Sequence, residues 1–434
     1  MQESRKKSSR RKGSVEIVPF QRSVDVGQIA VNVGAEFSEL LITGGLAIAA
    51  ALFREELERV CGPPHSRKGE GFATRWGQQR GEVVLGGRKV KLPRPRARRG
   101  GKEVILPAYA ELQREDPLND RTIEQMLIGV STRKYHRSLE RVIPDLAEFG
   151  VSKSAVSRRF VAMTSAQLES AMSRPLGSEQ WAALLVDGIQ FFEQVIVIVL
   201  GIDVSGRKHV LTFREGSTEN ATLCRELLSG VVVRGVPADQ SILLVIDGGK
   251  GLRRAVTEVF GEYAVVQRCQ VHKKRNVLDH LPEEPRAQLR GALNQAYAAE
   301  TYEVALRQLE NLARMLTQAH PSAAESLREG MKETICVKRL GVTGVLAKTL
   351  ETTNPIENLN GGIRRITGRV KRCRGGLMAL RWVATGALEV SRGFRRLKGY
   401  REMPKLIAAL RMLDNKINQN KLKHANVANV REVG

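Results

Sequence analysis

The stretches AALLVDGIQ (182–190), EQVIVIVLGID (193–203) and KHVLTFREG (208–216) decide the fold that we predict for this chain. Each is rich in β-branched and aliphatic residues, and short turns join them, as expected of neighbouring antiparallel strands. A helix is expected at about 219–232, followed by a strand at SILLVID (241–247), a helix after Gly251 and a short strand at YAVVQ (263–267). The pattern predicts a three-stranded meander that parallel strands and helical crossovers continue.

With a last helix beginning near Pro355, the order becomes βββαβαβα, which is the pattern of a ribonuclease-H-like domain of the α/β class. Residues 281–345 interrupt this order with Ala-, Leu- and Glu-rich sequence that has no β character. We therefore predict an all-helical insertion before the last helix. That helix is expected to break near Gly375-Gly376 and to continue towards Arg396.

Three acidic residues stand out against this pattern. Asp187 interrupts one apolar run, Asp247 ends another, and Glu357 in TTNPIENLNGGIRR (352–365) opens a basic helix. Ligands gather at the carboxyl ends of strands in open α/β sheets, so the fold can bring these carboxylates together. Carboxylates suit hard cations such as Mg²⁺, and two such ions about 4 Å apart can clamp a phosphodiester for in-line displacement.

Each carboxylate also has a purely structural alternative. Asp187 could be paired in the core, because a buried unpaired carboxylate is costly. Asp247 could cap the turn that follows its strand. Glu357 could be the acidic member of a capping box in which Asn354 is the N-cap and Pro355 the first helical residue.

The charge of the chain concerns its partners. Its 434 residues include 70 Lys and Arg against 46 Asp and Glu, a net charge of +24. Such an excess favours nucleic acid as the partner, with a generally adhesive protein as the alternative. The five scattered cysteines form no disulfide framework and indicate a reducing interior. The polar, basic N-terminus is unlike a signal peptide, and the apolar run at 40–53 is too short to span a bilayer, so we expect a core helix there.

Basic sequence dominates the first hundred residues. A basic tail (1–25) precedes a helix at about 35–60, and alternating residues around Gly86-Gly87 predict a hairpin. Eight of the fifteen residues from Arg88 to Lys102 are basic and none is acidic. An anion bound there would relieve the repulsion, although a solvated loop is the alternative reading.

The region 119–175 reads as a helical cluster. Asp120 can cap a first helix that ends at Gly129, Ser131 a second that ends near Pro144, and Ser152 or Ser154 a third. Short helices with a basic third member fit a helix-turn-helix-like DNA reader, with a plain helical bundle as the alternative.

Three features near the acidic residues remain open. Cys269 and His272 have zinc-like spacing but supply only two of the four ligands of a structural site, so we expect no zinc. Arg365 and Arg369 share one helical face and could bind phosphate or simply face solvent. Trp382 could stack on an extruded base or lie in the core.

Taken together, the motifs resemble the Mutator-type DDE transposases of bacterial insertion sequences. The resemblance rests on VDG (186–188), IDG (246–248), CQVHKKRN (269–276) and TTNPIENLNGGIRRITGRVKR (352–372), with LIGVSTRKY (127–135) and VSKSAVSRRF (151–160) upstream. It implies that Asp187, Asp247 and Glu357 are the catalytic, metal-binding residues, that Cys269 and His272 are a signature of unclear role, and that Trp382 follows the Glu helix as the family's aromatic does. Gly361 and Gly362 depart from the resemblance and should weaken the helix by about 1 kcal/mol each relative to alanine.

The resemblance also implies the activity and its partners. It implies two Mg²⁺ per site, replaceable by Mn²⁺, and double-stranded DNA in the form of terminal inverted repeats and target. A homodimer or larger assembly would act in the bacterial cytoplasm on the nucleoid, without a membrane. The DNA-binding residues that we expect are Arg94, Arg96, Arg98, Arg99, Ser157, Arg158, Arg159, His272, Lys273, Lys274, Arg364, Arg365, Arg369, Lys371, Arg372 and Trp382.

These interpretations predict seven segments. They are a tail (1–25), a DNA-binding or oligomerisation region (26–110), a helix-turn-helix-like domain (111–175), the catalytic domain (176–280 and 346–400), its insertion (281–345) and a C-terminal helix and tail (401–434).

Alternative functions are a domesticated DNA-binding regulator with an idle catalytic domain, a recombinase with a covalent Tyr or Ser, and a nuclease acting on RNA hybrids.

Overall fold

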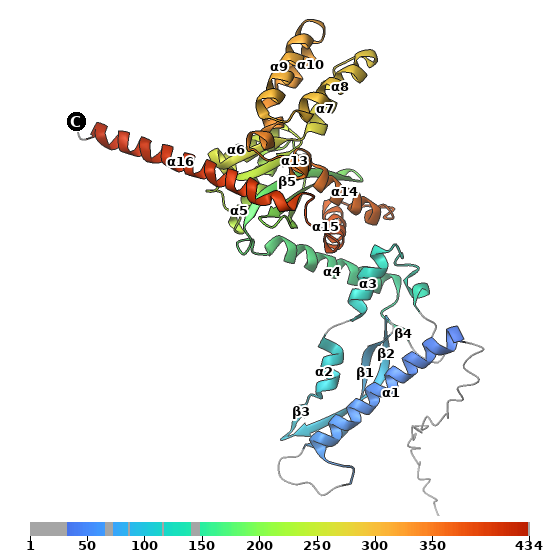
Figure 1. The fold of residues 1–434 in the computed structure, drawn as a ribbon. Coiled ribbons are helices and arrows are strands. Elements are labelled where there is room, and N and C mark those ends of the chain that lie inside the picture. The colour runs from blue at the N-terminus through green and yellow to red at the C-terminus, as the bar shows by residue number, and fades with distance from the viewer. Residues whose placement is uncertain (1–32, 66–72, 86, 115–116, 140–147, 433–434) are drawn as a thin grey trace, which may run out of the picture. The chain divides into compact units, whose positions relative to one another are not determined.

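A computed structural model describes residues 33–65, 73–85, 87–114, 117–139 and 148–432 (Figure 1). The chain divides into two compact units, which we describe separately. The first contains residues up to 118 together with 136–151, and the second contains 119–135 and everything from 152 onwards. The segment 111–175, expected as one helical domain, contributes to both units. The predicted tail at 1–25 lies outside the described residues.

In the first unit, a long helix packs on an antiparallel sheet. Helix α1 (Val33–Cys61) confirms the predicted helix, and the hairpin strands β1 (Thr74–Leu85) and β2 (Arg88–Arg99) confirm the predicted pairing. The sheet is larger than predicted, because β3 (Lys102–Val104) and β4 (Glu148–Phe149) also pair with β2. Helix α2 (Pro107–Arg114) completes the unit. Phe53 of α1 is buried against this sheet with Val83 and Leu92, so α1 is a core helix as expected. Over the described residues, no helix is both long and apolar enough to cross a membrane.

In the second unit, a mixed five-stranded sheet is the centre of the structure. Strands β5 (Trp181–Phe191), β6 (Gln194–Asp203) and β7 (Lys208–Glu215) form the predicted antiparallel meander. Strands β8 (Ile242–Ile246) and β9 (Ala264–Arg268) continue it in parallel with β5, which gives the order β7-β6-β5-β8-β9. The mixed α/β class predicted from the sequence is confirmed.

Helices cover both faces of this sheet because its central strands are apolar on both sides. Helices α5 (Ala221–Val233) and α6 (Lys250–Phe260) bury Leu228 and Val256 against one face, which Leu184 and Leu244 provide. The opposite face, with Leu185, packs against α4 (Lys153–Ser173), α14 (Asn354–Thr367), α15 (Gly376–Arg392) and the start of α16 (Met403–Glu432).

The helices α3 (Pro117–Leu127) and α4 confirm two of the three predicted helices at 119–175, and Ser152 caps α4 through the amide of Ala155. The predicted cap at Asp120 is wrong, because α3 begins at Pro117 and Asp120 lies in its first turn. The second predicted helix, from Ser131 towards Pro144, is wrong over 131–139, where turns and a 3-10 helix (Tyr135–Ser138) replace it. The fully buried Tyr135 ring indicates that packing overrides local propensity there. Residues 140–147 lie outside the described part.

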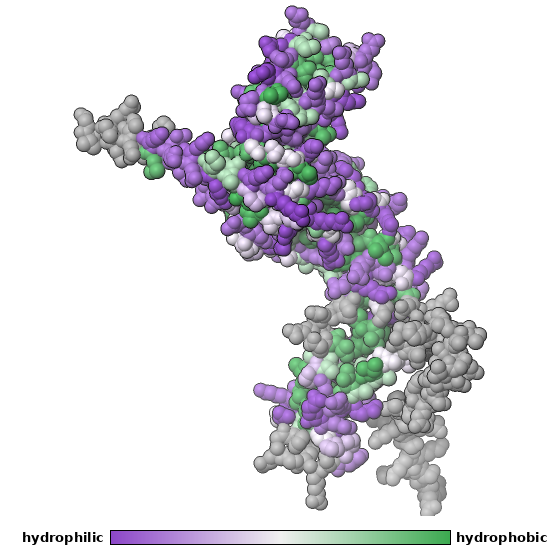
Figure 2. All heavy atoms as spheres, in the orientation of Figure 1, coloured by the Kyte–Doolittle hydropathy of each residue, from purple (hydrophilic) through white to green (hydrophobic). Residues whose placement is uncertain are grey.

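The all-helical insertion is present and has a core of its own. After α7 (Gln270–Asp279) come α8 (Glu283–Ala298), α9 (Tyr302–Ala319), α10 (Pro321–Arg328), α11 (Met331–Thr334) and α12 (Cys336–Arg339). Leu293, Leu309 and Leu327 form a cluster separate from both sheet cores. Figure 1 shows α7–α10 projecting from the sheet, and Figure 2 shows a mostly hydrophilic surface over them. Helix α13 (Gly344–Leu350) leads the chain back to α14.

Two adjacent glycines of α14, Gly361 and Gly362, have different surroundings, although both were expected only to weaken the helix. A Cβ at Gly361 would have nothing within 4 Å, whereas a Cβ at Gly362 would lie 2.7 Å from Val390 Cγ2 of α15. Gly362 therefore permits the close packing of the two helices, and only Gly361 is a simple weakness of the helix.

This difference gives a matched pair of substitutions. Gly361→Ala should raise the free energy of unfolding by about 1 kcal/mol through helix propensity. Gly362→Ala should lower it by about 1–3 kcal/mol, because the added methyl overpacks the contact with Val390. Urea unfolding followed by circular dichroism measures both, and equal stability of the two variants would contradict this packing.

Candidate metal-binding carboxylate site

Asp187 and Asp247 occupy neighbouring positions on two adjacent strands. The parallel register pairs Val186 of β5 with Ile246 of β8, and the two aspartates are the next residue on each strand. Strand β8 ends at Ile246, so Asp247 lies at its carboxyl end. Because neighbouring strands are about 4.8 Å apart, the register places the two carboxylates on adjacent backbones.

Asp187 is the most perturbed of the acidic residues. Its Oδ1 accepts a hydrogen bond from the Gly188 amide at 2.9 Å, and its Oδ2 accepts one from Asn360 Nδ2 at 2.9 Å. The pKa of Asp187 is raised to about 6, mainly by burial and also by the charges of Asp247 and Glu357, against the lowering by the Gly188 hydrogen bond and by His272. The charges of Asp247, His272 and Glu357 therefore all affect the pKa of Asp187.

Asp247 is half-buried in a tight turn between β8 and α6. Its Oδ1 accepts a hydrogen bond from the Gly249 amide at 3.0 Å, which is the turn-capping contact considered from the sequence. A neighbouring carboxylate, Glu219, was not predicted from the sequence. A Cβ placed on Gly249 would lie 2.9 Å from Glu219 Oε1 and 3.4 Å from Asp247 Oδ1, so the absent side chain allows both to approach. No motif marks Glu219, which lies in a polar loop before α5.

Glu357 lies in the first turn of α14 but does not cap it. The helix begins at Asn354 with Thr353 as the N-cap, one residue earlier than a capping box would require. The Thr353 amide donates to Cys269 Sγ at 3.4 Å, and not to Glu357. The capping-box alternative is therefore wrong, and Glu357 Oε1 instead accepts a hydrogen bond from the Thr353 hydroxyl at 2.6 Å.

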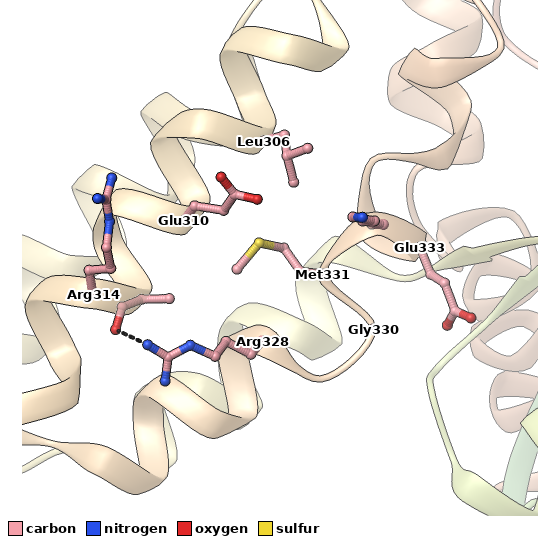
Figure 3. Close-up of a pocket in the computed structure, with 9 residues that line it drawn as sticks. Leu306, Glu310, Arg314, Arg328, Gly330, Met331 and Glu333 are labelled. Carbon is pink, nitrogen blue, oxygen red and sulfur yellow. Dashed lines mark hydrogen bonds between the residues drawn. The ribbon is translucent and has the colours of Figure 1, made fainter.

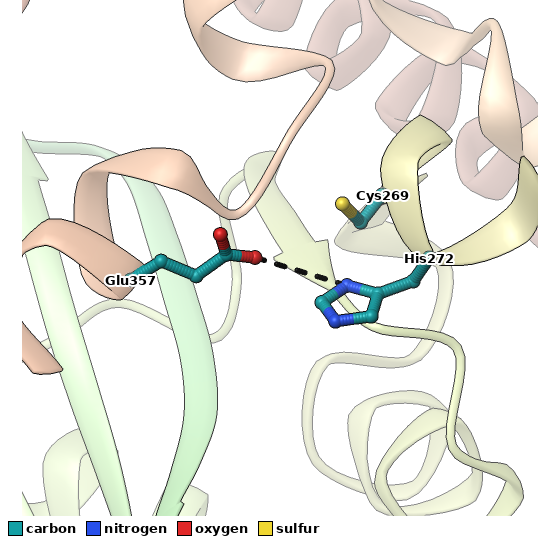
Figure 4. A group of neighbouring side chains, drawn as sticks. All are labelled: Cys269, His272 and Glu357. Atoms are coloured by element: carbon teal, nitrogen blue, oxygen red, sulfur yellow. Dashed lines mark ion pairs between the residues drawn. The ribbon is translucent and has the colours of Figure 1, made fainter. Parts of the chain in front are cut away.

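Cys269 and His272 lie beside Glu357, and Figure 4 shows the three side chains converging from α7 and α14. One ligand atom from each lies within 4.8 Å of the others, and His272 Nδ1 is 4.0 Å from Glu357 Oε1. Burial alone would raise the pKa of the Cys269 thiol, but hydrogen bonds with His272 and Thr353 bring it below its usual value. The same bond to Cys269 raises the pKa of His272.

Asn360 links α14 to β5, a contact that could not be predicted from the sequence. It lies three residues after Glu357 on the same helical face and is 1% exposed. Its Nδ2 holds Asp187, whereas its buried Oδ1 has no hydrogen-bond partner. An unsatisfied buried acceptor beside carboxylates is an environment that a cation or its bound water would complete.

The remaining predicted residues fall into exposed and buried groups. Ser157, Arg158, Arg364, Arg365, Arg369, Lys371 and Arg372 are exposed, and Arg159 is half-buried. Lys274 donates to Asn294, whereas Lys273 is 3% exposed and donates to the carbonyls of Ser326 and Glu329. The structure thus uses Lys273 to hold α10 against α7. Trp382 is 7% exposed and packs on Phe160 at 4.7 Å between ring centroids, so it lies in the core.

In the first unit, the predicted arginines lie along β2. Arg94 and Arg96 both contact Glu103, and Arg94 also stacks over Tyr109. Arg98 stacks over the exposed Trp76, and Arg99 is exposed at the end of the strand. Glu103 therefore neutralises only part of this basic strand.

A cavity of about 750 Å³ lies in the insertion, away from the three carboxylates. Figure 3 shows Glu310, Arg314 and Arg328 around it, with Arg328 donating to the carbonyl of Ala313 at 3.3 Å. Neither Asp187, Asp247 nor Glu357 lines it, so the carboxylate site is not part of this cavity.

Comparison with known proteins shows the family to which the chain belongs. The family model "Transposase, Mutator family" matches residues 28–388. The chain is 28% identical over 328 residues to the transposase for insertion sequence element ISRM5 of Rhizobium meliloti, which covers 73% of this chain and 79% of that protein. It is 27% identical over 286 residues to the transposase for IS905 of Lactococcus lactis, which covers 64% and 70% respectively. It is also 27% identical over 271 residues to the transposase for IS6120 of Mycolicibacterium smegmatis, at 60% and 81%. The chain therefore belongs to the Mutator family of transposases.

Proposed function

We propose that this protein is the DDE transposase of a bacterial insertion sequence. It binds the terminal inverted repeats of its element, hydrolyses DNA strands to leave a 3′-hydroxyl, and joins that hydroxyl to target DNA by transesterification. The observation that carries the proposal is the register of β5 and β8, which makes Asp187 and Asp247 neighbours within the electrostatic reach of Glu357. The bacterial relatives support an activity in the bacterial cytoplasm, where the DNA lies.

The sheet supports a ribonuclease-H-like catalytic domain. Three antiparallel strands followed by two parallel strands, in the order β7-β6-β5-β8-β9, match the arrangement expected from the sequence. Asp187 lies on the first strand of this domain, Asp247 follows the fourth and Glu357 opens the helix after the insertion.

The donor set fits divalent magnesium. Asp187, Asp247 and Glu357 supply hard carboxylate oxygens, and the unsatisfied Oδ1 of Asn360 adds a neutral oxygen beside them. We propose that these carboxylates hold two Mg²⁺, which Mn²⁺ can replace. When bound, such ions would activate the attacking oxygen and stabilise the leaving 3′ oxygen of an in-line displacement. Asn360 would keep Asp187 oriented, and no covalent link between protein and DNA is required.

The exposed basic residues would position the DNA. Arg364 and Arg365 lie on the same helix as Glu357, and Arg369, Lys371 and Arg372 follow it, so they can contact phosphates next to the scissile bond. Ser157 and Arg158 near the start of α4 and the arginines of β2 would bind the element ends. Two ends must be held together for transposition, which favours a dimer or larger assembly on DNA.

The first test removes one carboxylate at a time. Asp187→Asn, Asp247→Asn and Glu357→Gln should each abolish Mg²⁺-dependent cleavage of end-containing DNA while retaining end binding in a mobility-shift assay. The control is Asp239→Asn, an exposed aspartate that precedes β8 at the opposite end of the strand from Asp247. Strand transfer by Asp187→Asn at the unsubstituted rate would refute the assignment.

The second test uses the raised pKa of Asp187. Because burial raises this pKa from 3.8 to about 6, folding without metal is favoured while Asp187 is protonated and loses that stability as the pH rises through 6. In EDTA, Asp187→Asn should therefore become progressively more stable than the unsubstituted protein between pH 4 and 7. Addition of Mg²⁺ at pH 7 should stabilise only the unsubstituted protein. A difference in melting temperature that stays constant with pH would contradict the burial of an ionising Asp187.

The third test concerns β2. Replacing Arg98 and Arg99 with Gln should reduce the slope of log K against log salt for DNA binding by nearly two, because each phosphate contact contributes about 0.9. The matched control replaces Arg225 and Arg254, which ion-pair with Glu258 on the α5–α6 face. Equal slopes for the two double variants would mean that Arg98 and Arg99 face solvent and do not contact DNA phosphates.

A further inference from the structure

Cys269 and His272 have no role in the proposed chemistry, yet both lie against one buried hydroxyl. Thr353, the residue before α14, is 0% exposed. Its Oγ1 lies 2.6 Å from Glu357 Oε1, 3.3 Å from Cys269 Sγ and 3.4 Å from His272 Nδ1. One hydroxyl therefore contacts all three side chains that could otherwise hold a metal ion.

The chemistry of a hydroxyl gives this contact a direction. Thr353 has one proton to donate and two lone pairs with which to accept. The contact to Glu357 is the shortest of the three, and a carboxylate can only accept, so the proton points at Oε1. The lone pairs can then accept from His272 Nδ1–H, while Cys269 Sγ accepts a hydrogen bond from the Thr353 amide.

The same geometry argues against a metal ion between Cys269, His272 and Glu357. The Thr353 hydroxyl is within hydrogen-bonding distance of all three ligand atoms, so it competes with an ion for them. The Thr353 amide also donates to Cys269 Sγ. A structural zinc site would need four protein ligands, and only three converge among the described residues.

The contacts also fix where α14 begins. Cys269 directly follows β9 and is the N-cap of α7, so its position is set by the sheet. Its bonds to Thr353 and the bond from the Gln270 amide to the carbonyl of Glu351 at 3.0 Å attach the chain before α14 to the end of β9. The insertion separates these two segments in the sequence, and these hydrogen bonds hold them side by side in the structure.

We propose that Thr353, held by Cys269 and His272, is a positioning residue that fixes the Glu357 carboxylate for cation binding, and that the Cys-x-x-His pair serves this contact in place of a metal. The inference rests on the proposed role of Glu357 as a metal-binding residue. One Glu357 oxygen is engaged by Thr353, and the other can serve a cation. The Cys-x-x-His pair thereby acts on catalysis through a neighbour and does not touch the cations. In this proposal His272 has a positioning role in place of the DNA contact expected from the sequence.

The test compares Thr353→Val, which removes the hydroxyl while keeping the shape, with Thr353→Ser, which keeps the hydroxyl. Thr353→Val should lower cleavage and raise the Mg²⁺ concentration for half-maximal cleavage by about 10- to 100-fold, as expected for a residue behind a metal ligand. Thr353→Ser should restore most of both. Thr352→Val is the matched control, because the neighbouring Thr352 hydroxyl accepts from the Asn354 amide at 3.4 Å and should leave the Mg²⁺ dependence unchanged.

Because Thr353 is fully buried, His272→Gln provides a second variant at a half-exposed position. It should shift the Mg²⁺ dependence in the same direction while its circular dichroism spectrum and end binding stay those of the unsubstituted protein. Mn²⁺ titration without DNA measures the same effect on cation affinity independently of cleavage.

The outcomes separate this proposal from the one on which it rests. If Glu357→Gln is inactive while Thr353→Val and His272→Gln keep the normal Mg²⁺ dependence, the positioning role is refuted and the carboxylate assignment stands. If Glu357→Gln cleaves normally, the carboxylate assignment itself fails. Purified protein that carries one zinc per chain, lost in Cys269→Ala, would also overturn the proposal, because the pair would then bind metal.

Discussion

The structure of the second unit depends on the parallel pairing of β5 with β8. This register joins Val186 to Ile246 and thereby forces two carboxylates onto neighbouring strands at the point where β8 ends. Like charges so close repel each other, and burial raises the cost of ionising Asp187. The fold keeps this arrangement because the apolar strands on both sides are fully buried, and their burial outweighs a local electrostatic penalty. A site that is unfavourable without positive charge is one in which a cation is strongly stabilising.

The third carboxylate is held by a different device. Glu357 follows a helical excursion of more than sixty residues, and sequence distance alone gives no reason for it to return to the sheet. The insertion has its own core, and Gln267 and Arg268 of β9 attach its end to the sheet through Thr334, Val337 and Glu333. The return is secured by polar contacts at the junction, where Thr353 meets Cys269 and Asn360 meets Asp187. Apolar packing holds α14 against the sheet. The polar contacts of Thr353 and Asn360 determine where along the sheet the helix lies.

Much of this architecture could be predicted because the strands are uninterrupted apolar runs and the helices carry recognisable caps such as Ser152. Asp187 and Asp247 were visible for the same reason, since a charge within or at the end of such a run needs an explanation. Pairings between distant segments could not be predicted. Thr353 and Cys269 are 84 residues apart, and nothing in either local sequence indicates the other. Lys273 looked like a DNA contact within a basic run, but its burial depends on the docking of α10. The expected capping box failed by one residue, a difference that local propensity does not resolve.

The contact between Phe160 and Trp382 has a consequence for how such a protein can change its DNA target. Helix α4 commits Val156, Phe160, Thr164 and Leu168 to the core that it shares with α15, which in turn packs on the helix of Glu357. Only the outward positions, among them Ser157 and Arg158, can vary without disturbing that core. If α4 contacts the ends of the element, recognition of a new end sequence must come from substitutions at these few exposed positions. The buried face of α4 stays constrained by its packing against α15.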